Sequence, residues 1–399
     1  MNEGERPQMT MGNAQAGSAR RCVLEDVPRV GFYHEQQKHE DSKMRCPEDV
    51  CFPSCLRACL EYLGDGLGCR QIGACSPKRG LFCGYAYLMG TTGAAFRLSW
   101  KPGWHGDNVA TFLVSDDPAE IFRRGLASVG YGCEVVCRAE LRKQGADTEE
   151  HVRSRIIESI RDKGRPLIAH GVIGPPEECI VTGYDEGGDV VIGWNFFQSF
   201  REFATGVDFE PCGYFRKSNW FQDTWSLVLI GDRLEPPDGE LVIRDALSFA
   251  LDVVRTPVRY GDHHNGLAAY DAWAEHLLRD EDFATDDQSI LNQRLGVHDD
   301  AVGTVAEGRW YASVFLAQAA TAGVRLPASH LYDAASCYAA EHDLMWKAWG
   351  LVGGIGRSEE KARRLADADV RRRIVSVVRE ARAKDEDAAQ HLEAALGKG

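Results

Sequence analysis

The sequence lacks the features that mark membrane, secreted and nucleic-acid-binding proteins. No apolar run in its 399 residues approaches the length needed to cross a bilayer. The polar stretch 1–21 contains no apolar core that could serve as a secretion signal, so we expect a disordered leader there and a cytoplasmic protein. Positive charge is scarce as well. The net charge of −14 argues against nucleic acid or an anionic membrane as the main partner, because both bind basic patches.

Cysteine, in contrast, is abundant. In a reducing compartment the 13 cysteines are expected to be mostly free thiols, with metal-binding or catalytic roles open to some of them. Three cysteines at helical spacing stand in the stretch CFPSCLRACLEYLG, residues 51–64. This stretch therefore poses the first functional question.

Two patterns follow one another along the chain. From 22 to 235, short helical patterns alternate with runs rich in Val, Ile and aromatic residues, which indicates an α+β domain. The predicted strands lie at 94–100, 131–138, 165–173, 179–185, 188–194 and 224–232, and two of the helices at 116–130 and 147–164. From 236 to 399 the apolar residues recur at three- and four-residue spacing, which predicts an all-α cap domain after the double proline at 236–237.

The cysteine stretch is predicted to form a helix that starts near Pro53, because proline is tolerated in a first helical turn. No second pair of ligands follows at metal-site spacing, so we expect neither a metal nor another cofactor. Cys55 and Cys59 flank the apolar stripe and are expected in the core. Cys51 precedes the first turn, where the positive end of the helix dipole lowers a thiol pKa, and it is the candidate nucleophile.

The segment 46–232 resembles the N-terminal domain of the butirosin biosynthesis protein H family, which is similar in turn to C39-type cysteine peptidases and the wider papain-like fold. The likeness rests on the cysteine helix, on YLMGTTGAAFRLSW at 87–100, and on RPLIAHGVI…CIVTGYDEGGDVVIGWN at 165–195. It implies a papain-like (C39-like) fold with an antiparallel sheet. It also places Cys51 on the position of the family's nucleophile.

The chain departs from this family at the position of the base. The family's histidine opens the strand that leads into TGYD, and here that position holds Glu177. A carboxylate beside a thiol raises the thiol pKa, so this pair would copy a thiolate–imidazolium pair poorly. The orienting position falls at Asn195 or at its neighbour Trp194. His170, at the end of the preceding strand, either supplies the base or is an ordinary strand-end histidine.

The glycine-rich segment supplies candidate substrate-binding residues. Gly90 and Gly93 allow a close backbone approach and could present N–H donors to an oxyanion, or they form a tight turn before a buried strand. Arg97 would be costly to bury alone, so we expect it to meet a carboxylate, with Glu177 and Glu178 as candidates.

Three further histidines are candidates for substrate binding. His105 lies in the loop KPGWHGDN, which either lines a site or leads into a helix. His263 and His264 are predicted at the start of a helix, where only one of two adjacent side chains can reach a given cleft.

Two functional hypotheses remain. The first is cysteine-dependent acyl or amide chemistry, catalysed by an acyltransferase or a hydrolase of this type. The resemblance implies a small molecule or a carrier-protein-bound acyl group as the substrate. A homodimer is a possible oligomeric state. The second is a catalytically degenerate papain-like scaffold that binds a ligand or assists biosynthesis.

Overall fold

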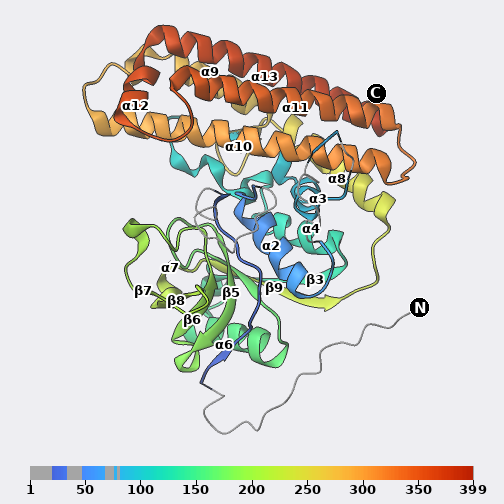
Figure 1. Cartoon of the computed structure of the whole chain (residues 1–399), viewed down its shortest axis with the longest axis vertical. Helices are drawn as coiled ribbons and strands as arrows, with labels where there is room; N and C mark the ends of the chain where they lie inside the picture. The colour runs from blue at the N-terminus through green and yellow to red at the C-terminus, as the bar shows by residue number, and fades with distance from the viewer. Residues whose placement is uncertain (1–19, 34–46, 68–75, 79–80, 399) are drawn as a thin grey trace. The chain divides into compact units, whose positions relative to one another are not determined.

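The chain passes three times between two compact units in the computed structural model, which describes residues 20–33, 47–67, 76–78 and 81–398 (Figure 1). The first unit comprises Met1–Val27 with Val136–Leu227, and the second comprises Pro28–Val135 with Val228–Gly399. The division expected at residue 236 therefore differs from the observed one, because the cysteine helix belongs to the second unit together with the C-terminal helices. The leader expected at 1–21 lies almost wholly outside the described residues.

The first unit is built on antiparallel strands. They belong to an eight-stranded sheet with the order β3-β9-β4-β5-β6-β8-β7, in which β1 also pairs with β5. The α+β prediction is thus confirmed. The strands of this sheet are β1 (Cys22–Val23), β3 (Tyr131–Cys137), β4 (Leu167–His170), β5 (Glu178–Asp185), β6 (Val190–Trp194), β7 (Val207–Phe209), β8 (Phe215–Ser218) and β9 (Ser226–Arg233).

The register of β4 and β5 positions the residues that the sequence singled out in this unit. His170 pairs with Glu178, and Leu167 pairs with Val181. The register between β5 and β6 shifts between Val181 and Gly183, which marks a β-bulge. The helical segments of this unit are α5 (Arg138–Lys143), α6 (Glu149–Ile157), η4 (Glu158–Asp162), η5 (Glu186–Gly188), η6 (Arg201–Phe203) and α7 (Trp220–Asp223).

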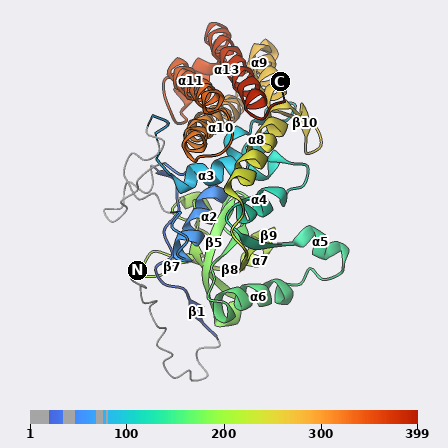
Figure 2. The ribbon, with the colours of Figure 1, turned by 90° about the vertical axis from the view of Figure 1, so that its right-hand side faces the viewer.

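The second unit is mainly helical. Figures 1 and 2 show its long helices α10, α11 and α13 lying side by side. Its α-helices are α2 (Cys51–Tyr62), α3 (Gly84–Thr91), α4 (Glu120–Ser128), α8 (Gly239–Arg255), α9 (Leu267–Leu278), α10 (Gln288–Thr321), α11 (Ala328–Val352), α12 (Glu359–Ala366) and α13 (Ala368–Ala395). Its 3-10 segments are η1 (Ala94–Phe96), η2 (Gly106–Val109), η3 (Thr111–Val114) and η7 (Asp280–Asp282). Among the described residues, no helix combines the length and the apolar character that crossing a membrane requires.

Side-chain caps set the starts of several of these helices. The carboxylate of Asp238 accepts from the backbone N–H groups of Glu240 and Leu241, and Asp367 caps α13 in the same way. Asp287 accepts from the N–H of Ser289 at the start of α10. These caps satisfy N–H groups that have no partner within the helix, which explains why each helix begins where it does.

Two expectations at the edge of this unit were wrong. The run 94–100 was expected to be one strand. Only Ser99–Trp100 forms a strand (β2), and the 3-10 segment η1 precedes it. His263 and His264 do not start a helix. They lie in β11 (His263–Asn265), which pairs with β2 and with β10 (Val258–Arg259). The helix begins three residues later, at Leu267 after Gly266.

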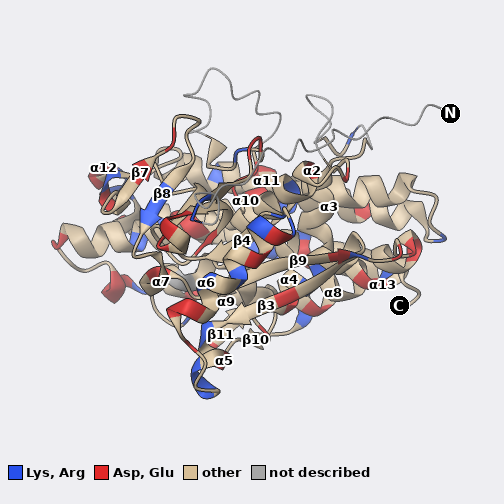
Figure 3. Ribbon diagram, turned by 90° about the horizontal axis from the view of Figure 1, so that it is seen from below, with Lys and Arg blue, Asp and Glu red and all other residues tan. Residues whose placement is uncertain are grey.

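Acidic and basic side chains are interspersed along the helices (Figure 3). Many of them pair at i,i+3 or i,i+4 spacing, as Arg244 does with Glu240 and Arg372 with Asp369. Such exposed pairs contribute little to stability individually. They agree with the charged, solvated faces expected of surface helices.

One ion cluster in the second unit is buried completely. Arg309 of α10 places a guanidinium nitrogen 2.7 Å from Asp385 of α13 and another 3.4 Å from Glu341 of α11. A third nitrogen donates to the backbone carbonyls of Ala95 and Arg97 at 2.9 and 3.2 Å. All three charged side chains are fully inaccessible to solvent. The cluster therefore joins three helices and the segment 95–97 around one cation.

The two carboxylates of this cluster outnumber its cation. Burial raises the pKa of Glu341 well above its ordinary value, and the charge of Asp385 adds to the shift. The hydroxyl of Tyr270 donates to Glu341 and further stabilises the arrangement. Removal of the guanidinium would leave two buried acids without a counter-charge.

We expect Arg309→Leu to lower the free energy of unfolding by about 3–5 kcal/mol, because it leaves Asp385 and Glu341 unpaired in the core. Urea unfolding followed by circular dichroism measures the change. Arg372→Leu is the matched control, since it breaks an exposed pair on α13 and should cost less than about 1 kcal/mol. Equal decreases in the free energy of unfolding of the two variants would contradict a central role for the buried cluster.

Candidate functional site

Cys51 is the first residue of α2, and Pro53 stands in the first turn. The residue is 4% exposed and its thiol is free of any disulfide. Cys55 and Cys59 are fully buried in the same helix, as expected of core residues. Cys51 thus opens a helix, which is the position expected of it from the sequence.

A tyrosine and a glutamate from two other helices hold the backbone just before Cys51. The N–H of Val50 donates to the hydroxyl oxygen of Tyr85 (3.0 Å), and this hydroxyl donates to Oε1 of Glu307 (2.6 Å). The N–H of Asp49 donates to the same Oε1 at 2.9 Å. The two peptide groups ahead of the cysteine are therefore fixed to α3 and α10. We call Asp49, Cys51, Tyr85 and Glu307 the α2-start cluster.

The two carboxyls of the α2-start cluster titrate close to neutral pH. Burial, with the charge of Asp49, raises the pKa of Glu307 to about 7, while the charge of Arg97 opposes the shift. Burial likewise raises the pKa of Asp49 to about 6. Both residues keep partial access to solvent. A carboxyl that titrates near the working pH and can exchange protons is suited to general acid–base catalysis.

Sequence reasoning missed Glu307, although the sequence carries a signal for it. Within the run 301–324, Glu307 and Arg309 are the only charged residues. A charged pair in so apolar a helix indicates buried partners, since unpaired charges are seldom buried. The signal does not name those partners. Tyr85 and Asp49 are distant in sequence, and only the folded chain brings them to Glu307.

The predicted substrate-binding glycines of the second unit serve in packing. A Cβ on Gly90 would stand 2.3 Å from the ring of Phe315, so this position requires glycine for the contact between α3 and α10. Gly93 has φ of 81°, and a Cβ there would meet the ring of Phe249 at 2.6 Å. Its N–H donates to the carbonyl of Gly90. Gly90 thus serves close helix packing, and Gly93 forms the turn between α3 and η1.

Arg97 is buried, and its guanidinium donates to the carbonyls of Ala94 and Val109 at 3.0 and 3.1 Å. Its positive charge opposes the rise in the pKa of Glu307. Arg97 therefore acts on a carboxyl of the α2-start cluster, and its expected pairing with Glu177 or Glu178 stays a prediction. Arg97 offsets part of the negative charge that Glu307 and Asp49 would otherwise concentrate there.

The three candidate histidines of this unit lie in different surroundings. His105 is exposed at the start of η2, and its carbonyl accepts from the side chain of Asn108. His263 is buried with Nδ1 3.0 Å from the carbonyl oxygen of Tyr260. His264 is half-buried in the same strand, where successive side chains point to opposite faces.

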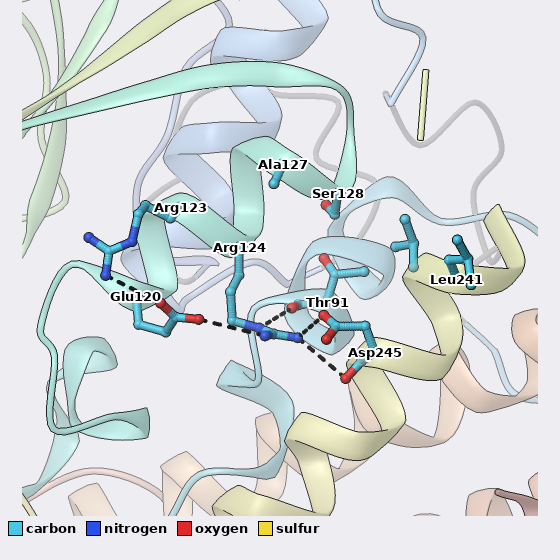
Figure 4. A pocket seen from close by; sticks show the side chains of 9 residues that line it. Thr91, Glu120, Arg123, Arg124, Ala127, Ser128, Leu241 and Asp245 are labelled. Atoms are coloured by element: carbon cyan, nitrogen blue, oxygen red, sulfur yellow. Dashed lines mark hydrogen bonds and ion pairs between the residues drawn. The ribbon is translucent and has the colours of Figure 1, made fainter. Parts of the chain in front are cut away.

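A surface hollow of about 370 Å³ lies between α3, α4 and α8 (Figure 4). Arg124 crosses it, donating to the carbonyl of Thr91 at 3.3 Å and pairing with Asp245, and its guanidinium stacks on Phe249. The lining residues are Thr91, Glu120, Arg123, Arg124, Ala127, Ser128, Leu241, Val242 and Asp245. They include neither cysteine nor histidine, so this hollow offers binding surface without a nucleophile or an imidazole.

The other predicted catalytic residues, His170, Glu177 and Asn195, lie in the first unit. His170 is buried at the end of β4, and its Nε2 donates to the carbonyl of Pro176. In the neutral ring this tautomer carries the basic lone pair on Nδ1. Glu177 stands just before β5 and is half-buried.

Asn195 holds the loop that connects His170 to Glu177. Its Nδ2 donates to the carbonyl of Ile173 (3.3 Å), and its Oδ1 accepts from the N–H of Phe197 (2.7 Å). A hydrogen bond from Asn195 also reaches the buried thiol of Cys179, although burial dominates there and raises the pKa of this thiol to about 12. The position expected to orient a base thus orients the β4–β5 loop.

This loop has a strained backbone. Gly171 and Gly174 have φ of 101° and 77°, and the buried Val172 has φ of 77°, a region that a β-branched residue rarely adopts. A Cβ on Gly171 would stand 2.1 Å from the carbonyl oxygen of Asp223, so this glycine is obligatory. Strain of this kind persists where surrounding contacts over-determine it, often at functional sites.

Comparison with protein-family models gives no match, and no curated protein is significantly similar to the chain. The resemblance to the butirosin biosynthesis protein H family therefore stays a prediction that rests on the residues quoted for it.

We expect Asn195→Ala to destabilise the first unit by about 2–3 kcal/mol, because the carbonyl of Ile173 and the N–H of Phe197 lose a buried partner. Urea unfolding measures it. Asn292→Ala, at an exposed position of α10, is the control and should change the stability by less than about 0.5 kcal/mol. A loss no larger than that of the control would show that Asn195 does not hold the loop.

We expect Glu307→Gln to change how stability depends on pH. The folded pKa of Glu307, about 7, lies above its ordinary value of 4.5, so the folded state binds the proton more tightly. Its contribution to stability is complete below pH 4.5 and is lost as the pH rises through about 7. The free energy of unfolding of the variant, relative to wild type, should therefore rise by about 3 kcal/mol between pH 4.5 and 8.

Urea unfolding at several pH values between 4.5 and 8 tests this expectation. Glu360→Gln replaces an exposed glutamate of α12 and serves as the matched control. Parallel pH profiles for wild type and Glu307→Gln would show that the carboxyl titrates at its ordinary pKa.

Proposed function

We propose that the chain is an enzyme of acyl or amide chemistry that uses Cys51 as its nucleophile. The observation that supports it most is the α2-start cluster, in which the cysteine opens a helix next to two carboxyls that titrate near neutral pH. A helix start favours a developing thiolate, because the first N–H groups and the dipole present positive charge. A papain-like fold of the C39 type is part of this proposal.

The chemistry proposed is attack of the thiol on a carbonyl carbon, with formation of an acyl-enzyme and departure of a thiol or an amine. An acceptor amine or water then takes the acyl group and releases Cys51. The substrate class is a small molecule or an acyl group on a carrier protein. A base must take the thiol proton in the first step, and Glu307 of the α2-start cluster is the candidate within the second unit.

The role of Glu307 can be tested through the titration of Cys51. Glu307→Gln removes a negative charge near the start of α2 and should lower the apparent pKa of Cys51. Glu360→Gln, at an exposed position of α12, is the control and should leave this pKa unchanged. The pH profile of Cys51 alkylation, measured for both variants, shows whether Glu307 acts on the thiol.

A scaffold without catalysis is the second candidate. It is favoured by the low exposure of Cys51 and by the glutamate at the position where the family has its histidine. In this alternative the α2-start cluster is a buried polar network that fixes the helix, and any ligand binds without covalent chemistry.

We expect Cys51 to react with iodoacetamide faster near neutral pH than Cys55 and Cys59, which are completely buried. Intact-mass labelling followed by peptide mapping measures the rates. Peptide mapping separates Cys51 from the exposed Cys212, which also labels. Cys51→Ser should remove one fast-reacting thiol from the count, whereas Cys55→Ser should leave that count unchanged. An acyl-N-acetylcysteamine thioester serves as the substrate probe, and its turnover should fall at least about 10²-fold in Cys51→Ser.

Two outcomes would overturn the enzyme proposal. One is alkylation of Cys51 no faster than that of Cys55 and Cys59. The other is turnover of the thioester that Cys51→Ser leaves unchanged.

A further inference from the structure

Two histidines and an aspartate from two helices converge at one end of the helical bundle. His330 and Asp333 stand one turn apart near the start of α11, and His391 stands in the last turns of α13. One potential ligand atom from each residue lies within 4.8 Å of the others. The histidines are half-buried and the aspartate is exposed. All three residues belong to the second unit.

The spacing of the two imidazoles suits a shared metal ion. Nδ1 of His330 lies 3.4 Å from Nδ1 of His391. Two nitrogens at about 2.0–2.1 Å from a tetrahedral Zn²⁺ are separated by roughly 3.3–3.4 Å. Without an ion, these facing nitrogens can form a single hydrogen bond, with one as donor and the other as acceptor. With an ion, both lone pairs are used.

The carboxylate of Asp333 completes a three-ligand set. Its Oδ2 lies 3.9 Å from Nδ1 of His391, and because the side chain is exposed, a small rotation shortens this distance without disturbing the core. Asp387, one turn before His391, pairs with Lys384 at 3.2 Å and so has its own counter-charge. Two imidazoles and one carboxylate are ligands that Zn²⁺ accepts readily.

We propose that His330, Asp333 and His391 form a binding site for Zn²⁺ or a similar divalent transition-metal ion, which ties the start of α11 to the end of α13. Three protein ligands leave a fourth tetrahedral position for water or for a group from a partner. The site is independent of the proposed chemistry at Cys51, and none of its residues belongs to the α2-start cluster.

The test uses the full chain, stripped with a chelator and then titrated with Zn²⁺ against a chromophoric competitor. Wild type should bind one equivalent at this site, and His330→Asn, His391→Asn and Asp333→Asn should each weaken it at least about tenfold. His151→Asn, at an exposed position of the first unit, is the matched control and should bind like wild type. Melting temperatures without metal verify that each variant is folded.

Substitution with Co²⁺ separates this site from thiolates, which matters in a chain with 13 cysteines. The Co²⁺-loaded wild type should show the visible absorption bands of a tetrahedral site, and each variant should lose them. The near-ultraviolet charge-transfer band of a cobalt–thiolate bond should not differ between wild type and variants. Zn²⁺ should also raise the melting temperature of wild type and not that of His391→Asn, because a ligand of the native state stabilises it. Equal affinities and equal spectra for wild type and all three variants would overturn the proposal.

Discussion

The ion pair between Arg309 and Asp385 is the interaction on which the second unit depends most. A guanidinium without access to water must have its charge and its donors satisfied inside the protein, and α11, α13 and the carbonyls of 95–97 satisfy them here. Few relative positions of these helices satisfy the guanidinium completely. The ion pair therefore restricts how α10 can be placed along α11 and α13. Glu307 stands two residues before Arg309 on the same helix. The buried cation therefore also fixes the carboxyl that reaches the start of α2.

Two buried acids in this unit illustrate how solvent access separates structural from chemical roles. Glu341 is completely buried, and its pKa lies well above its ordinary value, so it has no route to exchange a proton near pH 7. Glu307 keeps partial exposure, and burial together with the charge of Asp49 raises its pKa only to about 7. The same desolvation that makes one acid a fixed part of the core makes the other a group that changes charge at working pH.

Local patterns in the sequence predicted most elements of the fold. The helices of the C-terminal half follow from apolar spacing. Each unit is formed by two separate stretches of the chain, and this division could not be predicted. Local sequence patterns indicate the type of each element but not which distant elements pack together. His263 and His264 were assigned to a helix for the same reason: pairing with β2, distant in sequence, makes this segment extended. Likewise, the neutral titration of Glu307 depends on Asp49 and Tyr85, which no local pattern connects to it.

The charge around Cys51 bears on how a thiol there would react. In papain-like enzymes an imidazolium stabilises a preformed thiolate, whereas carboxylates oppose one. Glu307 and Asp49 near the start of α2 oppose a thiolate at Cys51, whereas the helix dipole and Arg97 favour one. In the proposed reaction a half-ionised carboxyl accepts the thiol proton while the sulfur attacks, since the negative charge then moves to the carbonyl oxygen instead of accumulating on sulfur. A bound substrate would therefore react with Cys51 without requiring a fully ionised thiolate.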